Sequence, residues 1–389
     1  MNNIFDRVID RTGTSSFKWD FRAEMTGIPD ILPMWVADMD FAAPEPVINA
    51  LAQRAAHGVY GYTGHPDSFF QAVSRWFEQV HGWGIEPGSM VVTPGVVPAL
   101  NMAVRAFTRP GDRIVLQPPV YYPFMWAVEN NEREIVYNPL ERADDTWRMN
   151  LDDLEEKFRA GARMLILCSP HNPVARVWRR RELSELAEVC KRHDVLVVSD
   201  EIHADLAMPG FRHYPLESLA PELKQRLITC TAPSKTFNLA GLQVSAIVIP
   251  NPGLRKKFAA AMKSAGLGLS NPFGITAAEA AYRHGLEWRN DLIRYIQGNQ
   301  DYLVAFCREY IPWARPLPLE GTYLAWIDCR DAKLDDETLK KRLREVARVW
   351  LDDGPMFGPG GEGFQRMNIA CPRATLKKAL HRMAAMPLS

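Results

Sequence analysis

The stretch Thr231-Ala232-Pro233-Ser234-Lys235-Thr236-Phe237-Asn238-Leu239-Ala240-Gly241 places one lysine among small and hydroxylated residues. Apolar runs at 227–230 and 244–249, on either side of it, favour buried strands. A lysine that forms a Schiff base must lose its proton, and surroundings that exclude water lower its pKa. Lysines on surface loops are common, so this stretch alone leaves a catalytic lysine and a solvated loop as equal alternatives.

Length and composition narrow the classes of protein to consider. A chain of 389 residues predicts two domains, or one large α/β domain with an appended lobe. The 46 basic and 46 acidic residues cancel, which argues against a nucleic-acid partner and against binding to a membrane surface. The six cysteines form no Cys-x-x-Cys pair, so we expect reduced thiols and no metal site. We expect a cytoplasmic protein, because no run has the length of a signal peptide or a membrane span.

Strand-like and helix-like segments alternate through the first two thirds of the chain. Helical spacing at 46–57 and 68–80 is followed by strands at 90–93, 113–117, 134–137, 164–168 and 195–199, with helices at 96–107, 151–158 and 182–193 between them. This alternation predicts a parallel sheet covered by helices on both faces. Ligands of such sheets bind beyond the carboxyl ends of the strands.

Polar motifs stand where three of these strands end. They are Ser169-Pro170-His171-Asn172-Pro173, Asp200-Glu201-Ile202-His203 and the segment around Lys235. We expect them to converge at one edge of the sheet. The turn Pro94-Gly95 before a helix offers free backbone N–H groups to an anion, although every strand-to-helix turn has this shape. Asp38 and Asp40 are either a carboxylate pair or residues that turn the chain before Pro44.

The pattern changes from about residue 286. A long amphipathic helix at 291–310 precedes strands at 323–327 and 364–369, a helix at 336–346, and a final helix from Ala374. Turns rich in proline and glycine occupy 353–363. This composition predicts a separate α+β lobe.

Taken together, the motifs resemble the fold-type I PLP-dependent enzymes, and within them the MalY/PatB-type cystathionine β-lyases. The markers span nearly the whole chain: residues 35–41, Gly61-Tyr62, 169–173, 199–203, 234–238 and Arg366-Met367-Asn368. The resemblance implies an α/β fold like that of aspartate aminotransferase. Its large domain, at 46–288, would hold a mostly parallel seven-stranded sheet covered by helices. Residues 1–45 and 289–389 would form the smaller α+β domain.

The resemblance also assigns residues to the cofactor, pyridoxal 5′-phosphate (PLP). Lys235 would hold PLP through a Schiff base and then remove the Cα proton of the substrate. Asp200 would pair with the pyridine nitrogen, Asn172 would donate to the phenolic oxygen, and Tyr121 would stack on the ring. The remaining cofactor contacts would come from Gly95, Val96, Val97 and Ser234 at the phosphate, from Tyr62 of a neighbouring subunit, and from His203. A homodimer with shared active sites follows from the reach of Tyr62.

Four residues would meet the substrate. Arg366 would bind its α-carboxylate as a bidentate fork, and Trp35, Ala37 and Tyr323 would line the rest of the pocket. The chain departs from many aminotransferases of this fold at two positions: His203 replaces a tyrosine, and Gln243 replaces an arginine that clamps the phosphate. These changes leave phosphate binding more dependent on neutral donors.

Three functions are compatible with this resemblance. A β-lyase would cleave cystathionine or related cysteine S-conjugates to a thiol, pyruvate and ammonia. An aminotransferase would share the first proton transfer, but a dicarboxylate substrate would need a second arginine, which we do not identify. A regulatory protein partner is a third function that an enzyme of this group can add. Neutral net charge and the lack of a helix-turn-helix pattern argue against direct DNA binding.

Overall fold

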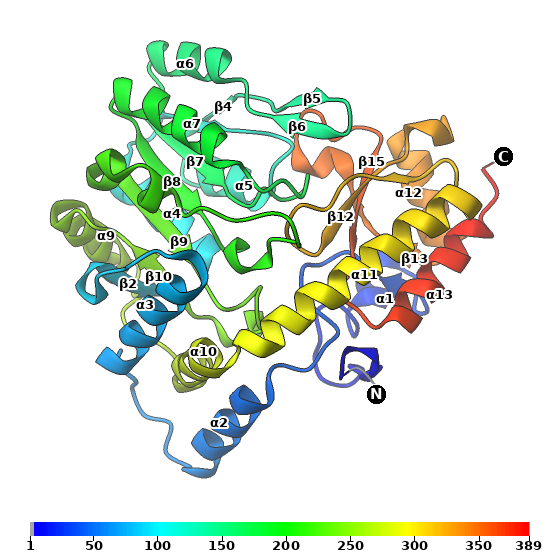
Figure 1. Cartoon of the computed structure of the whole chain (residues 1–389), viewed down its shortest axis with the longest axis horizontal. Coiled ribbons are helices and arrows are strands. Elements are labelled where there is room, and N and C mark those ends of the chain that lie inside the picture. Colours follow the sequence, from blue (N-terminus) through cyan, green and yellow to red (C-terminus); the bar gives the residue numbers. More distant parts are fainter. Residues whose placement is uncertain (1–3, 389) are drawn as a thin grey trace.

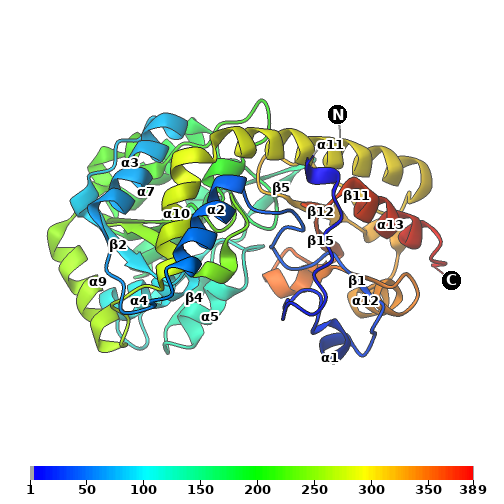
Figure 2. The same ribbon diagram turned by 90° about the horizontal axis from the view of Figure 1, so that it is seen from below.

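The computed structural model describes residues 4–388. Met1–Asn3 and Ser389, which the sequence assigns to the smaller domain, lie outside the described residues. The chain forms a large α/β part around one sheet and a smaller part around a second sheet (Figures 1 and 2).

The large part is built on a seven-stranded sheet. In spatial order its strands are β2 (Met90–Thr93), β10 (Ser245–Val248), β9 (Leu227–Thr231), β8 (Leu196–Asp200), β7 (Met164–Cys168), β3 (Arg113–Leu116) and β4 (Glu134–Tyr137). Neighbouring strands from β9 to β4 are parallel, whereas β10 runs antiparallel to both β9 and β2. The expected mostly parallel sheet is therefore confirmed.

Helices cover both faces of this sheet because its strands are apolar on both sides. Leu165 and Leu167 of β7 pack into one hydrophobic cluster, and Met164 and Ile166 pack into the other. The first cluster includes α6 (Leu151–Arg159), α7 (Arg180–Arg192) and α8 (Leu216–Leu219); the second includes α4 (Val96–Phe107), α5 (Pro123–Glu129) and α9 (Pro252–Ser264). Alternation of side chains with a period of two along each strand produces this division.

The third cluster joins the large part to the smaller one. It holds apolar residues of α2 (Glu45–Ala56), α3 (Asp67–His81), α10 (Pro272–His284), α11 (Leu286–Tyr310) and α13 (Arg373–Ala384). In both views α11 runs from the end of α10 along the smaller part (Figures 1 and 2). This helix starts five residues before the predicted start at 291, directly after Gly285. The helices α9 and α10 were not expected from the sequence.

The smaller part holds a four-stranded antiparallel sheet. Its order is β11 (Arg315–Pro316), β12 (Leu324–Asp328), β15 (Phe364–Asn368) and β14 (Asp352–Asp353). The N-terminal segment contains α1 (Arg22–Thr26) and β1 (Leu32–Pro33), and β1 pairs with β13 (Val349–Trp350) beyond α12 (Asp336–Glu345). A separate hairpin joins β5 (Glu141–Ala143) to β6 (Thr146–Arg148).

The pairing of β1 with β13 supports the grouping of residues 1–45 with 289–389, while the exact domain boundaries stay a prediction.

The order of the strands brings the three polar motifs to one edge of the sheet, as expected. Strands β7, β8 and β9 are parallel neighbours, so the segments that follow them leave the sheet at the same edge. The six cysteines are buried and free.

Candidate active site

A cavity of about 170 Å³ lies at this edge of the sheet, beside the start of α4. Ten of the residues that the sequence singled out line it: Ala37, Gly95, Val96, Val97, Tyr121, Asn172, Asp200, His203, Ser234 and Lys235. They come from segments up to 198 residues apart in the chain, as in the contact between Lys235 and Ala37. The structure brings these ten together, while Trp35, Tyr62, Tyr323 and Arg366 lie outside the lining.

Lys235 has an amine whose charge is disfavoured by its surroundings. Burial lowers the pKa of Lys235 to about 8, and the charge of Arg366 acts in the same direction, while Asp38 and Asp200 oppose it. The amine donates a hydrogen bond to the carbonyl oxygen of Ala37 at 2.7 Å. A substantial fraction of this lysine is therefore unprotonated near pH 8, as a nucleophile or a base requires.

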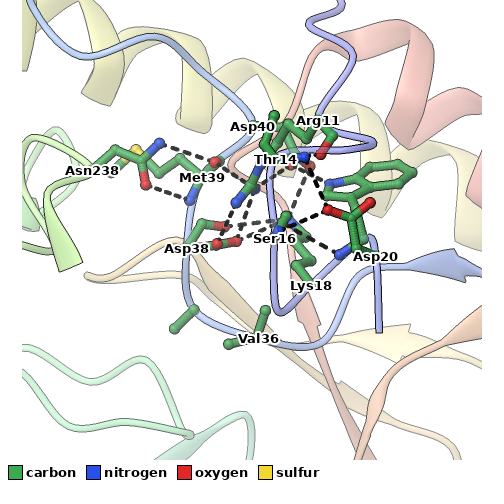
Figure 3. Close-up of polar contacts among 12 residues, drawn as sticks. Arg11, Thr14, Ser16, Lys18, Asp20, Val36, Asp38, Met39, Asp40 and Asn238 are labelled. Carbon is green, nitrogen blue, oxygen red and sulfur yellow. Dashed lines mark hydrogen bonds and ion pairs between the residues drawn. The ribbon is translucent and has the colours of Figure 1, made fainter. Parts of the chain in front are cut away.

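The segment that carries Ala37 is fixed to the lysine loop by Asn238. The backbone N–H of Met39 donates to Asn238 Oδ1 at 3.0 Å, and Asn238 Nδ2 donates to the carbonyls of Met39 at 3.0 Å and Phe41 at 2.9 Å. Tyr323 donates its hydroxyl to the carbonyl of Ala37 at 2.9 Å, beside the bond from Lys235. Figure 3 shows Asn238 facing Met39 in this arrangement.

Asp38 and Asp40 anchor the same segment by ion pairs (Figure 3). Arg11 contacts Asp38 at 2.7 Å and Asp40 at 2.8 Å, and the buried Lys18 contacts Asp40 at 2.8 Å. Burial alone would raise the pKa of Asp40, but Lys18, Trp19 and Arg11 hold it below its ordinary value. The two aspartates are therefore partners of cations from the N-terminal segment, and neither lines the cavity.

Asp200, the last residue of β8, is buried and lines the cavity. Burial raises the pKa of Asp200 to about 7, against the opposing effects of the Ile202 backbone N–H at 3.1 Å and the charge of Lys235. Within residues 4–388, no basic side chain forms an ion pair with it. A buried carboxyl group of this kind is suited to a bound group that brings its own N–H or positive charge.

The start of α4 offers hydrogen-bond donors and a partial positive charge, in contrast to the carboxyl group of Asp200. Gly95 precedes the helix with φ of 144°, a backbone conformation that residues other than glycine rarely adopt. Gly95 also has no side chain that could cap the helix. The N–H groups of the first turn lack partners within a helix, and the helix dipole adds a partial positive charge. Ser234 and Gln243 line the cavity as well. An oxyanion such as a phosphate fits this end.

Tyr121, Asn172 and His203 form other parts of the wall. Burial raises the pKa of the Tyr121 phenol, so the phenol stays neutral. Burial also lowers the pKa of His203 well below its ordinary value. His203 Nδ1 is buried and finds no partner among the described residues. An unpaired buried nitrogen in a cavity wall is suited to a polar ligand.

Arg366 lies behind this wall, and sequence analysis did not find the residue that balances its charge. The guanidinium donates to Asn172 Oδ1 at 2.8 Å and to the Trp35 carbonyl at 3.3 Å, and forms an ion pair with buried Asp352. It also stacks on Phe357, 4.7 Å from the ring centroid. Asp352 faces Arg366 directly across the β14–β15 pair, so only knowledge of that register could have revealed it.

Two predicted contacts lie away from this cavity. The Trp35 ring stacks on Trp350 with centroids 4.2 Å apart, so only its backbone approaches Arg366. Tyr62 is 97% exposed on the loop between α2 and α3. Its contact with a neighbouring subunit stays a prediction.

Residues 4–388 contain neither a cluster of side chains suited to a metal ion nor a helix suited to span a membrane. No group of three or more histidine, cysteine, aspartate or glutamate side chains is arranged to hold a metal ion. No helix in this part of the chain is long and apolar enough to cross a membrane.

Comparison with known proteins agrees with this geometry. Residues 29–383 match the family model of class I and II aminotransferases. The chain is 46% identical to cystathionine beta-lyase PatB of Bacillus subtilis, over 98% of this chain and 99% of PatB. It is 35% identical to protein MalY of Escherichia coli, over 97% of this chain and 96% of MalY.

A solved structure extends the comparison to three dimensions. The crystal structure of cystalysin from Treponema denticola, which contains a pyridoxal 5′-phosphate cofactor, superposes with a TM-score of 0.96 at 36% identity. The match covers 99% of this chain and 98% of cystalysin. The chain therefore belongs to the class I and II aminotransferase family, and within that family it groups with PatB and MalY.

Proposed function

We propose that this protein is a PLP-dependent C–S β-lyase that cleaves cystathionine or related cysteine S-conjugates to a thiol, pyruvate and ammonia. The observation that carries the proposal is a single cavity that joins a lysine of lowered pKa to a buried carboxyl group without a cationic partner. The similarity to PatB, whose name states this activity, supports the same substrate class.

The residues of the cavity fit PLP. Asp200 supplies a carboxyl group for the ring nitrogen, and the start of α4 with Ser234 suits the phosphate. Tyr121 offers an aromatic face, and Asn172 and His203 offer polar groups. When bound, PLP supplies an electron sink that stabilises negative charge at the Cα of an amino acid.

The side chains around the cavity bind and orient the substrate and move its proton. Arg366 binds the substrate carboxylate and so orients the Cα–H bond toward Lys235. Lys235 Nζ removes the Cα proton, the Cβ–S bond breaks, and the thiolate leaves. Asp200 would hold a proton on the ring nitrogen of the bound cofactor. The enamine that elimination leaves is released and takes up a proton at Cβ, and the resulting imine adds water to give pyruvate and ammonia. The Ala37 carbonyl accepts a hydrogen bond from the free amine of Lys235 and so would orient this amine after the substrate displaces it from the cofactor.

An aminotransferase is the second candidate, and the name of the matching family favours it. The same lysine and aspartate would serve, because the two reactions differ in where the Cα proton goes after removal. No arginine is among the residues that line the cavity, all of which lie in the described part of the chain. Arg366, behind the cavity wall, is already assigned to the α-carboxylate, and no second arginine among the described residues is identified for the distal carboxylate of a dicarboxylic substrate.

We further propose a homodimer in which Tyr62 of each protomer completes the partner's active site. The nearly full exposure of Tyr62, together with the exposed Tyr60 and Val59 beside it, supports this arrangement. Apolar side chains gathered on one loop are typical of a surface that another chain covers.

The first prediction concerns the reaction. Incubation with L-cystathionine and no 2-oxo acid should yield equal amounts of pyruvate and free thiol, measured together over time. Lys235→Ala should abolish both products, whereas the exposed Lys263→Ala should leave the rate unchanged. Transfer of the amino group to the cofactor without pyruvate would contradict a lyase and identify an aminotransferase.

The second prediction concerns the shared site. Lys235→Ala and Tyr62→Ala homodimers should each have little activity. After unfolding and refolding together, random pairing gives half hybrids with one intact site each, or about a quarter of the wild-type activity. No recovery from dimers shown to have exchanged subunits would contradict a shared site, and so would a monomer at the assay concentration.

The third prediction concerns Asp352 as a positioning residue for Arg366. Asp352→Asn removes the ionic partner of the guanidinium, so KM for the amino acid should rise by about 10- to 100-fold, the value of one charged hydrogen bond. The change in kcat should be much smaller, and Asp352→Glu should recover part of the affinity.

Asp353→Asn is the matched control, because its side chain pairs with Lys340 and Arg344 instead. The ratio of kcat/KM for each amino-acid substrate to kcat/KM for its carboxamide tests further whether Asp352 positions Arg366. If Asp352→Asn keeps the wild-type preference for the free carboxylate while remaining folded, Asp352 does not position Arg366.

A further inference from the structure

A second hollow, of about 450 Å³, has walls rich in cationic side chains. It lies between the end of α3, the segment 204–213 and the first turns of α11. Its lining residues, all within the described part of the chain, include three arginines and two histidines but no aspartate or glutamate: Arg212, Arg289, Arg294, His81 and His213. In a chain with equal numbers of acidic and basic residues, such a wall attracts anions.

Two of the arginines are held in place before any ligand binds. Arg289 is half-buried and donates to the Asp205 carbonyl at 2.7 Å and to Asn290 Oδ1 at 3.0 Å. Burial lowers its pKa, which indicates a cation that has lost part of its hydration. The guanidinium of Arg212 lies over the Tyr214 ring, 5.2 Å from its centroid.

In the described part of the chain, Arg212 and Arg289 lack direct ionic partners, although the Asp205 carboxylate attracts Arg289 without contacting its guanidinium. Within residues 4–388, neither Arg212 nor Arg289 forms a salt bridge with an acidic side chain, whereas Arg294 pairs with the exposed Asp291. Arginines fixed in position and lacking anionic partners are suited to bidentate recognition of carboxylate or phosphate groups.

The two histidines connect this hollow to the candidate active site. His81 Nε2 lies 2.8 Å from Asp205 Oδ1, and Asp205 Oδ2 accepts a hydrogen bond from the Thr236 hydroxyl at 2.7 Å. Thr236 directly follows Lys235 in the chain. The Asp205 carboxylate is buried, so a change at its histidine partner is poorly screened by water.

A second histidine–carboxylate pair connects the hollow to the segment that carries Asp200. His213 Nε2 lies 2.9 Å from Glu201 Oε2, and Glu201 directly follows Asp200. The rings of His81 and His213 lie 5.4 Å apart in an edge-to-face arrangement. Both histidine–carboxylate pairs therefore join the wall of the hollow to a segment that carries a key residue of the active site.

We propose that this hollow is a regulatory site for a small oxyanion with at least two negative charges, either a phosphate ester or a polycarboxylate, and that its occupation alters the surroundings of Lys235 through Asp205 and Thr236. The inference goes beyond the proposed lyase reaction and holds for an aminotransferase equally. Burial lowers the pKa of His81, and an anion bound beside this histidine would favour its protonated form. The protonated ring attracts the Asp205 carboxylate more strongly and so weakens the hydrogen bond that Asp205 accepts from Thr236.

The test uses the holoenzyme, in which the cofactor already occupies the other oxyanion site, at the start of α4. Inorganic pyrophosphate and citrate are titrated separately by calorimetry, with sodium chloride added to match ionic strength. Wild-type protein should bind at least one of them, and the double variant Arg212→Gln/Arg289→Gln should bind about tenfold or more weakly. The exposed Arg308→Gln on the same helix is the matched control and should bind as wild type.

Two further readouts separate a regulatory site from adventitious binding. The ligand that binds should change the absorbance of the lysine-bound cofactor or the KM for substrate, and Thr236→Val should retain binding but lose this change. No binding of either probe overturns the proposal, as does binding that the double variant leaves unchanged. Binding with no effect on the cofactor or on KM overturns the connection to Lys235.

Discussion

Burial of Lys235 against the sheet edge is the constraint on which the rest of this site depends. Burial lowers the pKa of this lysine to about 8 even though Asp38 and Asp200 favour its charged form. Burial also raises the pKa of Asp200 to about 7. Burial thus moves the pKa values of both groups toward neutral pH, in the way that enzymes tune carboxyl groups upward and lysines downward.

The fold forms this cavity by bringing a segment of the N-terminal part and a segment of the C-terminal part to the sheet edge. The N-terminal segment is anchored by Arg11 and Lys18 on Asp38 and Asp40, and Asn238 joins it to the lysine loop. From the C-terminal part, Tyr323 reaches the Ala37 carbonyl, to which the lysine amine also donates. The positions of the catalytic groups therefore depend on contacts between the large and the smaller part, which is where closure motions of enzymes commonly act.

Much of this arrangement could be predicted because its signals are local in the sequence. Alternating strands and helices predicted the sheet, and polar motifs after β7, β8 and β9 predicted that Asn172, Asp200 and Lys235 would converge. Contacts between residues that are far apart in the sequence could not be predicted from local patterns. Asp352 opposes Arg366 only through the register of β14 and β15, and the ion pairs of Arg11 depend on how the N-terminal segment folds back. The link from His81 to Thr236 likewise joins three separate segments through a single buried carboxylate.

The most direct test of this account is the titration of Lys235 itself. Carbon-13 NMR of cofactor-free protein with labelled lysine side chains would follow each amine with pH, and Lys235→Arg would identify its signal. The account predicts a midpoint near the value of about 8 set by burial, well separated from the solvent-exposed lysines. A midpoint at the ordinary lysine value of 10.5 would contradict it, because the amine would then be hydrated and the cavity could not prepare it as a base.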